Sequence, residues 1–373
     1  MKVLHITRDF APRDNGGLSR GVETMVRMAA LARPDLEQAV LSFDGYRPRR
    51  AGPAELVVAK GPWGPEARLG GVGALADARD FARRFEPEVV HVHHAMLWPF
   101  AREALPAAPA VFGLHVLQRA MGRLRGVEAA SESERLEAQA LEEAAVITVP
   151  SVFCRSQLAT TRAPVIVWPL AHHDTPEARA EAERDHPSGT PDRLLYVGRF
   201  ADVKGIVELL AAMPRVTAAR PGTTLVLAGG LPDNPKAERR WRRRAEAVPG
   251  VEVAGWLDRD ALRHRYAESA LLVAPSWIET YGLAVQDAMA HGLAVVASAT
   301  GALVERVTSG ETGWLVAPRD SEALADALIE ACRDVGELRR RGRAAARSIR
   351  AGHLVAHHLE APRQSYALAL ESR

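Results

Sequence analysis

Short apolar runs alternate with longer helical stretches along the whole chain, and this alternation limits the fold more than any other feature. In the first half, the runs that we interpret as strands are KVLHITR, QAVLSF, AELVVAK, EVVHVHH, APAVFGLH, AVITVPS and APVIVWPL. Most are rich in β-branched residues and bounded by Pro, Gly or charge. Near-continuous apolar strands are typical of parallel sheets covered by helices on both faces, so the sequence predicts an α/β fold.

The same pattern restarts after a polar stretch, PEARAEAERDHPSGTPDR, at residues 176–193. The strands expected there are LLYVGRF, TTLVLAGG, VEVAGWL, ALLVAPS, LAVVASA and TGWLVAP. Two successive βα arrays predict two Rossmann-like, doubly wound domains that face each other across a cleft. We place the domains at residues 1–188 and 189–350, and we expect residues 351–373 to pack back toward the first. Ligands of such sheets bind beyond the carboxyl ends of the strands, so functional residues should follow strands directly.

The composition excludes several classes of protein. Hydrophobic residues make up 47% of the 373 residues, and a net charge of +2 argues against nucleic acid as the main partner. No run approaches the roughly 18 apolar residues of a spanning helix, so we expect no stable membrane insertion. Cys154 and Cys332 lie in separate halves, which indicates a reducing compartment and excludes a disulfide framework. We expect a cytoplasmic protein whose oligomeric state stays open.

Two cations lie where a predicted strand meets a predicted helix, in YVGRFADVKGIVELL. Arg199 closes the strand and Lys204 comes just before the helix, so both could point into the cleft beside a helix N-terminus. Such a position suits a phosphate group. The pair therefore predicts a diphosphate site, and the alternative is two solvated surface cations.

Two carboxylates surround another predicted helix start, in SWIETYGLAVQDAMAHG. Glu279 precedes the helix and Asp287 lies on its second turn, while backbone N–H groups around Tyr281, Gly282 and Leu283 could bind an anion. A carboxylate beside an anion site should bind hydroxyls rather than phosphate. A nucleotide sugar carries a diphosphate between two hydroxyl-bearing rings and would fit. The alternative is an acid that favours the helix dipole, together with a solvated Asp.

These segments resemble the retaining glycosyltransferase family 4. PSWIETYGLAVQDAMAHGLAVVAS is similar to its signature, YVGRFADVKG to its diphosphate-binding segment, DNGGLSRGVETMV to its N-terminal Gly-Gly loop, and TSGETGWLVAP to its late strand. The likeness covers nearly the whole chain in the right order. It implies the GT-B fold, with an acceptor-binding N-terminal domain and a donor-binding C-terminal domain. One departure is Asp287, where the family usually has Glu.

The resemblance also implies roles for single residues. Gly16 and Gly17 would let the backbone approach the donor diphosphate, because glycine has no Cβ. Arg199 and Lys204 would hold that diphosphate as it leaves, and Leu257 lies in the segment that would recognise the base.

The reacting sugar and the ribose would have separate partners. Glu279 would contact hydroxyls of the donor sugar, Asp287 the ribose, and His115 the region of the reacting sugar, although His115 could instead be structural. In retaining members the donor phosphate takes the acceptor proton, so the resemblance implies no metal and no cofactor.

We therefore expect a retaining glycosyltransferase that moves a sugar from a nucleotide diphosphate donor to a small-molecule acceptor. The Ala- and Arg-rich usage resembles that of GC-rich bacteria, where such enzymes often decorate secondary metabolites such as antibiotics. A cell-envelope lipid or polysaccharide acceptor is the alternative. A catalytically silent partner subunit is another.

Four further motifs suggest other roles. LGGVGALADARDF contains a Gly-x-Gly-x-x-Ala pattern at Gly71, Gly73 and Ala76, which would suit a nicotinamide-dependent oxidoreductase, but ten residues separate it from the preceding strand. HVHH at 91–94 and HHD at 172–174 look like metal ligands, yet adjacent residues of a strand point in opposite directions. RRWRRR at 239–244 could touch acidic membranes, although a short charged helical segment of this kind is more often a solvated helix face.

Overall fold

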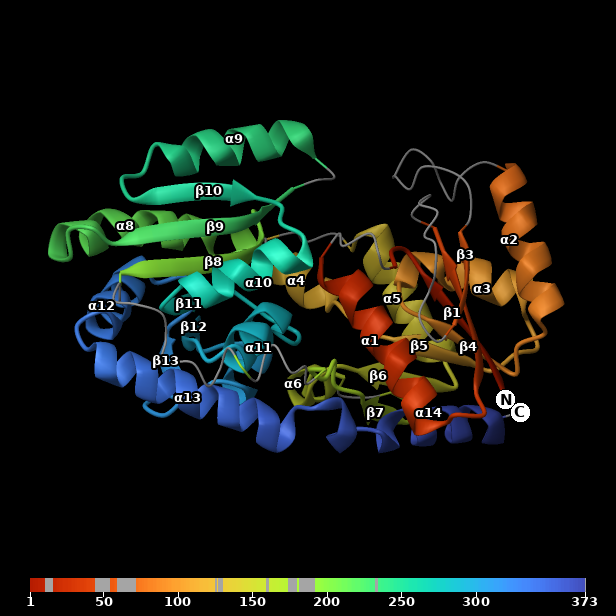
Figure 1. Cartoon of the computed structure of the whole chain (residues 1–373). Coiled ribbons are helices and arrows are strands. Elements are labelled where there is room, and N and C mark those ends of the chain that lie inside the picture. The colour runs from red at the N-terminus through yellow and green to blue at the C-terminus, as the bar shows by residue number, and fades with distance from the viewer. Residues whose placement is uncertain are drawn as a thin grey trace. The chain divides into compact units, whose positions relative to one another are not determined.

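The chain forms two compact units in a computed structural model (Figure 1). The described residues are 1–10, 16–43, 54–58, 72–124, 126, 130–158, 161–173, 180, 192–231 and 234–372. Residues 1–171 and 358–373 make the first unit, and residues 172–357 make the second. The boundary expected at 188/189 lies outside the described residues and stays a prediction.

A parallel sheet of seven described strands is the centre of the first unit. Its strands are β1 (Lys2–Thr7), β2 (Glu37–Ser42), β3 (Glu55–Val58), β4 (Val89–Val92), β5 (Ala110–Gly113), β6 (Val146–Val149) and β7 (Val165–Val167). Their order is β3-β2-β1-β4-β5-β6-β7, so the winding direction reverses between β1 and β4. The pairing puts His5 of β1 directly beside His91 of β4.

Helices cover this sheet, and the last one comes from the far end of the chain. They are α1 (Gly17–Ala32), α2 (Val72–Phe85), α3 (Trp98–Ala104), α4 (Gln118–Leu124), α5 (Glu132–Glu143), α6 (Val152–Ser156) and α14 (Glu360–Glu371), with a 3-10 turn, η1 (Ala95–Leu97). The α14 helix packs on α1 and on strands β4 to β7 (Figure 1). Arg363 Nε donates to the carbonyl of Ala32 at 2.9 Å, and Tyr366 is fully buried.

The second unit has its own parallel sheet, of six described strands. The strands are β8 (Arg193–Arg199), β9 (Thr224–Gly230), β10 (Val251–Gly255), β11 (Leu271–Ala274), β12 (Ala294–Ser298) and β13 (Gly313–Val316). Their order is β10-β9-β8-β11-β12-β13, which reverses between β8 and β11. This repeats the doubly wound arrangement of the first unit with one strand fewer.

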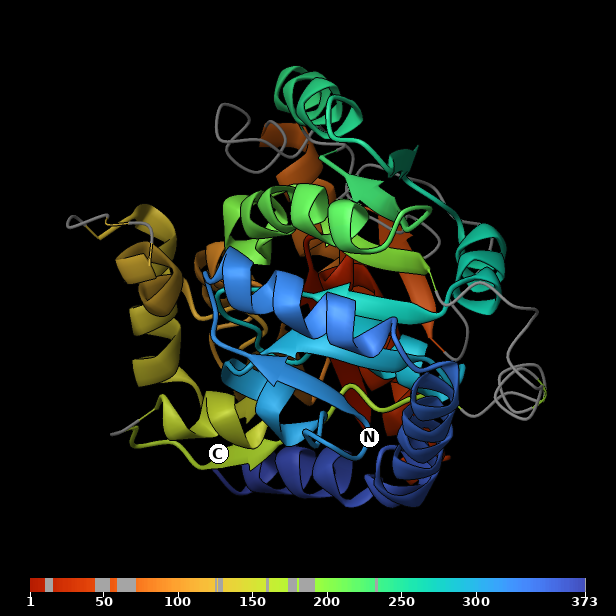
Figure 2. The ribbon, with the colours of Figure 1, turned by 90° about the vertical axis from the view of Figure 1, so that its left-hand side faces the viewer.

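Helices pack on both faces of this second sheet. They are α8 (Ile206–Ala219), α9 (Pro235–Glu246), α10 (Arg259–Glu268), α11 (Leu283–Ala290), α12 (Ser321–Ala331) and α13 (Val335–Gly352), with 3-10 turns η2 (Asp202–Lys204), η3 (Gly301–Glu305) and η4 (Val355–His357). Figure 2 shows α8, in green, beside α12, in blue, and these two helices pack against each other. Leu209, Met213 and Leu328 are buried in the core on this side.

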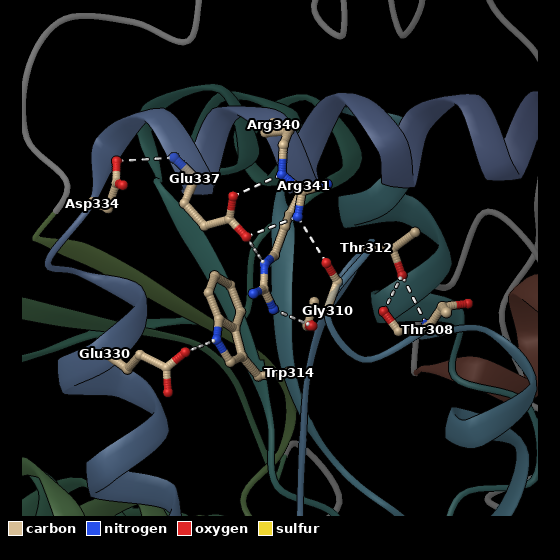
Figure 3. Close-up of polar contacts among 10 residues, drawn as sticks. Thr308, Gly310, Thr312, Trp314, Glu330, Asp334, Glu337, Arg340 and Arg341 are labelled. Atoms are coloured by element: carbon tan, nitrogen blue, oxygen red, sulfur yellow. Dashed lines mark hydrogen bonds and ion pairs between the residues drawn. The ribbon is translucent and has the colours of Figure 1, made fainter.

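A polar cluster fastens α13 to β13 at the edge of the second sheet (Figure 3). Arg341 stacks its guanidinium over the Trp314 ring at 3.8 Å and donates to the Gly313 carbonyl at 2.7 Å. Glu337 accepts hydrogen bonds from Arg340 and Arg341, which lower the pKa of this carboxyl to about 2. The β13 strand, which corresponds to the TSGETGWLVAP motif, is therefore fixed by polar and stacking contacts with the charged helix α13.

The predicted fold class is confirmed. All thirteen predicted strands are present, in two doubly wound parallel sheets. The arginine-rich segment 239–244 lies on α9, where Trp241 is 8% exposed and packs into the core. Cys154 and Cys332 are buried, and neither is in a disulfide. Among the described residues, no helix has the length and apolar composition needed to cross a bilayer.

Candidate functional site

The switch point of the second sheet brings two connections together at the carboxyl ends of neighbouring strands. The β8 strand continues into η2, and the β11 strand continues into the loop that precedes α11. The backbone N–H of Trp277 in that loop donates to the carbonyl of Val203 in η2 at 2.9 Å. An open α/β sheet binds its ligands at this kind of position.

Lys204 and Glu279 meet at this point. Lys204 Nζ lies 2.6 Å from Glu279 Oε2, and the two side chains are 32% and 17% exposed. Ser276 Oγ donates to the same carboxylate oxygen at 3.5 Å. The site therefore presents a cation and a carboxylate side by side, both partly open to solvent.

Two glycines allow the backbones to approach closely enough for this pair to form. Gly205 has φ 70°, and a Cβ there would lie 1.9 Å from the Pro275 carbonyl oxygen. Gly301 has φ 55°, and its Cβ would lie 2.2 Å from the Glu279 carbonyl oxygen. That carbonyl accepts a hydrogen bond from Ala302 N–H at 2.8 Å. Any other residue at these glycines would displace the loop that carries Glu279.

Arg199 ends β8, as predicted, and is half-buried. The Tyr196 hydroxyl donates to the Arg199 carbonyl at 2.7 Å, which fixes the strand end. Burial raises the pKa of the Tyr196 hydroxyl, and the nearby negative charge of Glu279 raises it further. This tyrosine therefore stays neutral and acts as a hydrogen-bond donor.

The helix start that follows Glu279 also matches the expectation. Gly282, with φ 88°, is the N-cap of α11, and Leu283 is the first helical residue. Because glycine has no capping side chain, the N–H groups of the first turn suit an external anion. Tyr281 is buried, and Arg306 donates to its carbonyl at 2.6 Å while stacking 3.6 Å from its ring. Tyr281 thus contributes backbone rather than an open side chain.

Asp287 lies on the second turn of α11, as predicted, but it is 6% exposed. Its Oδ1 lies 3.6 Å from His172 Nδ1, and its carbonyl oxygen lies 2.7 Å from His291 Nδ1. As expected, Glu279 lies in the loop and Asp287 on the helix, and the Asp287 side chain is the more buried of the two.

Three other expected site residues, Gly16, Gly17 and Leu257, lie on segments other than those that carry Lys204 and Glu279. Gly16, with φ 119°, is the N-cap of α1, and Gly17 is its first residue. Leu257 follows β10 and is partly buried against the hydrophobic cluster that contains Leu195 and Leu272.

The oxidoreductase pattern includes Gly71, which lies outside the described residues, and Gly73 and Ala76, which lie in α2.

His115 follows β5 in the first unit, is partly buried, and lies beside three buried histidines whose grouping sequence reasoning missed. His5, His91 and His93 are 0%, 0% and 1% exposed, and one ring nitrogen from each lies within 4.8 Å of the others. The expectation that histidines of 91–94 cannot converge is wrong for His91 and His93, because residues two apart on a strand point to the same face. The H-x-H spacing of His91 and His93 was the sequence signal that could have shown this.

Of the second metal-like motif, HHD at 172–174, Asp174 lies outside the described residues.

The comparisons with known proteins agree with this architecture. The family model described as "Glycosyltransferase Family 4" matches residues 15–171, and the one described as "Glycosyl transferases group 1" matches residues 191–334. The chain belongs to glycosyltransferase family 4. The first match covers most of the β1–β7 unit, and the second covers the strands that carry Arg199, Lys204 and Glu279.

Two curated relatives of this family 4 chain have different names. It is 31% identical over 279 residues to a glycogen synthase of Mycobacterium tuberculosis, a match covering 70% of this chain and 64% of that protein. It is 29% identical over 170 residues to an alpha-D-kanosaminyltransferase of Streptomyces kanamyceticus, covering 45% and 43%. The matched region thus spans less than two thirds of each relative's length.

Solved structures share the fold of this family 4 chain over its full length. Sucrose-phosphate synthase from Thermosynechococcus elongatus aligns with a TM-score of 0.78 at 21% identity, covering 100% of both chains. Anabaena HepE in complex with UDP-glucose aligns with a TM-score of 0.74 at 17% identity, covering 98% of this chain and 99% of that one. These likenesses establish the GT-B fold.

Proposed function

We propose that this chain is a retaining, metal-independent glycosyltransferase that moves a sugar from a nucleoside diphosphate sugar to a small acceptor. The observation that carries the proposal is the 2.6 Å pair of Lys204 and Glu279 at the carboxyl edge of the second sheet. A ligand that engages both groups needs an anion for the ammonium and hydroxyls for the carboxylate, within a few ångströms of each other. A sugar joined to a diphosphate has this arrangement.

The α11 helix supplies the second part of the argument. Its N-terminus, capped by Gly282, follows Glu279 by three residues. Helix N-termini favour phosphate oxygens, so the diphosphate has both backbone donors and a cation available. Arg199 adds a second cation at the end of β8. These charges stabilise the diphosphate as it leaves, which is the role a metal ion plays in other transferases.

The family resemblance supplies the stereochemistry and the remaining roles. In this proposal the departing phosphate takes the acceptor proton on the face it leaves, so the sugar keeps its anomeric configuration. Glu279 and His115 contact the reacting sugar, and Asp287 contacts the ribose. Gly16 and Gly17 lie against the diphosphate, and the backbone near Leu257 contacts the base. The UDP-glucose complex of HepE supports a nucleotide sugar as the donor.

The proposed acceptor is a small molecule, namely a bacterial secondary metabolite. The kanosaminyltransferase supports this choice by its name, whereas the glycogen synthase supports a polymer. Because the two relatives differ in this respect, the acceptor must be identified by assay.

The test begins with donor binding. Nucleotide sugars are screened by thermal shift, since a ligand at 100 times its Kd stabilises a protein by roughly 2.7 kcal/mol. The best donor is then followed for hydrolysis and transfer, with and without a chelator, and the anomeric configuration of the product is read by NMR. A shift with NAD and none with any nucleotide sugar would favour an oxidoreductase. Donor binding without hydrolysis or transfer would favour a silent subunit, and loss of turnover in chelator would contradict metal independence.

A further inference from the structure

Two buried histidines of the first unit, His5 and His93, join His115 in a chain of hydrogen bonds. Gln38 Oε1 lies 3.0 Å from His5 Nε2, and His5 Nδ1 lies 3.0 Å from His93 Nε2. His93 Nδ1 lies 3.1 Å from His115 Nε2. Gln38 is on β2, His5 on β1, His93 just after β4 and His115 just after β5. The chain thus crosses the sheet from strand to strand.

One amide group sets the direction of this chain. Gln38 Nε2 donates to the Val26 carbonyl at 3.2 Å, so its Oε1 is the atom that faces His5. The reversed amide would bring two carbonyl oxygens together at Val26. The Gln38 oxygen therefore accepts from His5 Nε2–H, and the amide anchors the chain at its inner end.

The polarity then passes from ring to ring. A neutral imidazole has one N–H and one acceptor nitrogen. With its proton on Nε2, His5 accepts at Nδ1 from His93 Nε2–H, and His93 in turn accepts at Nδ1 from His115 Nε2–H. Burial keeps these rings neutral, because it lowers the pKa of His5 and of His115 to about 4 and that of His93 well below its ordinary value.

A glycine makes room for the last link. A Cβ at Gly113 would lie 3.0 Å from His93 Nδ1 and 3.2 Å from His115 Nε2. It would also lie 3.2 Å from His91 Nε2. A methyl group at this position would therefore press on the hydrogen bond that joins His93 to His115.

The ring arrangement favours this relay over a metal site. His5 and His93 lie edge to edge, with planes 9° apart, centroids at 5.3 Å and facing ring nitrogens 3.0 Å apart, whereas His91 lies against His93 with centroids at 4.1 Å and planes 29° apart. A metal ion binds the in-plane lone pair of each imidazole. The lone pair of His5 Nδ1 is occupied by the 3.0 Å hydrogen bond with His93 Nε2, so it is not available to a metal ion shared with His91.

We propose that Gln38, His5 and His93 are positioning residues that hold His115 as its Nε2–H tautomer, which leaves Nδ1, a buried atom in this structure, as the acceptor that a substrate hydroxyl would meet. The second half of this statement rests on the proposed function, in which His115 contacts the reacting sugar. The first half concerns the protein alone. The two halves therefore have separate readouts.

The first readout is the tautomer of each ring in the full-length protein, measured by NMR of the histidine ring nitrogens at pH 7.5. We expect His5, His93 and His115 all to carry the proton on Nε2. An Nδ1–H form at any of the three overturns the relay, whatever the activity. A stoichiometric metal ion that is lost in His5→Gln also overturns it.

The second readout compares Gln38→Met with Thr148→Val. Gln38→Met keeps the length of the side chain and removes the acceptor at the inner end. Thr148→Val removes a buried hydroxyl, 1% exposed, that faces His91 Nε2 at 3.2 Å, outside the relay. We expect Gln38→Met to give a mixture of His115 tautomers and to lower kcat roughly tenfold or more with little change in KM. Thr148→Val should leave both unchanged.

The outcomes separate the relay from the proposed function. Should Gln38→Met fail to fold, Gly113→Ala takes its place as the variant that disturbs the His93–His115 bond. A scrambled His115 tautomer with full turnover, while His115→Ala loses turnover, overturns the positioning role. Predicted tautomers with no transfer by wild-type protein to any acceptor support the relay and count against the proposed function.

Discussion

Lys204 and Glu279, 75 residues apart in the sequence, form an ion pair with a separation of 2.6 Å because β8 and β11 are neighbours in the sheet. The sequence predicted separate partners for them, phosphate for the lysine and sugar hydroxyls for the glutamate. Their contact means that each group affects the charge that the other presents to a ligand. A diphosphate at Lys204 must share it with Glu279.

Because Lys204 would serve both Glu279 and the diphosphate, the direction of each variant's effect on ligand affinity can be predicted. Lys204→Ala should weaken binding of the nucleoside diphosphate product by roughly 1.5–3 kcal/mol, the range for hydrogen bonds to charged groups. In that background Glu279 is an unpaired negative charge beside the phosphate, so adding Glu279→Gln should restore part of the affinity. Titration calorimetry of the single and double variants measures both effects. Arg215→Ala, which removes an exposed cation from α8 of the same unit, is the control. A double variant that binds no better than Lys204→Ala would show that the pair is not coupled through the ligand.

The two carboxylates should fail differently in kinetics. Glu279→Gln should lower kcat, because a small displacement of a reacting group can cost about 10²-fold. Asp287→Ala should mainly raise the donor KM, as expected for lost binding at a remote handle such as the ribose. Steady-state kinetics over a range of donor concentrations separates the two. Equal effects of both variants on kcat would contradict the assigned roles.

Gly205 gives a matched test of the backbone contact at the site. Gly205→Ala adds a Cβ 1.9 Å from the Pro275 carbonyl oxygen, whereas a Cβ at Gly222, with φ 96°, would meet no atom of a non-adjacent residue within 4 Å. Gly222→Ala should cost about 1–2 kcal/mol of unfolding free energy from the positive φ alone. Gly205→Ala should cost more and should also weaken nucleoside diphosphate binding, because it displaces Lys204. Urea unfolding and calorimetry check both, and equal losses in the two variants would remove the special role of Gly205.

Glu137 should make the first unit sensitive to pH. Burial raises the pKa of its carboxyl from 4.5 to about 7, and the backbone N–H of Gln118 donates to it at 3.2 Å. A folded pKa above the unfolded one means that this stabilisation is complete below about pH 4.5 and is lost as the pH rises through about 7. Glu137→Gln, which stays neutral, should therefore be within about 1 kcal/mol of wild type in unfolding free energy at pH 5 and exceed it by roughly 3 kcal/mol at pH 8.

The measurement for Glu137 is urea unfolding of both proteins at the two pH values. Glu142→Gln, which changes an exposed acid on the same helix, should show no gain that depends on pH. The same difference between variant and wild type at pH 5 and pH 8 would rule out a buried titrating carboxyl at position 137.

The strands and their winding were predictable because each is a short, nearly unbroken apolar run between turn residues. The positions of Arg199 and Lys204 at a strand end, and of Glu279 and Asp287 around α11, followed from the same boundaries. These features depend on local sequence, where periodicity and glycine carry most of the information.

The contacts between side chains were not predictable in this way. The pairing of Lys204 with Glu279 depends on the sheet order and on the close approach at Gly205 and Gly301. His5 could be placed beside His91 only once the register of β1 on β4 was known. It was visible in the sequence that His91 and His93 are two residues apart. To see that they share one face of the strand, the two-residue period of a strand had to be applied to them.

The α14 helix, residues 360–371, belongs to a unit whose other residues are 1–171. During synthesis, the whole of residues 172–357 must be translated before this helix can reach β4 to β7. At the usual 5–20 residues per second, the nascent first unit therefore waits roughly 10 to 40 seconds without its last covering helix. Through that interval the apolar surface that will meet Tyr366 and Ala369 is uncovered, and exposed apolar surface of this kind makes folding intermediates prone to aggregate.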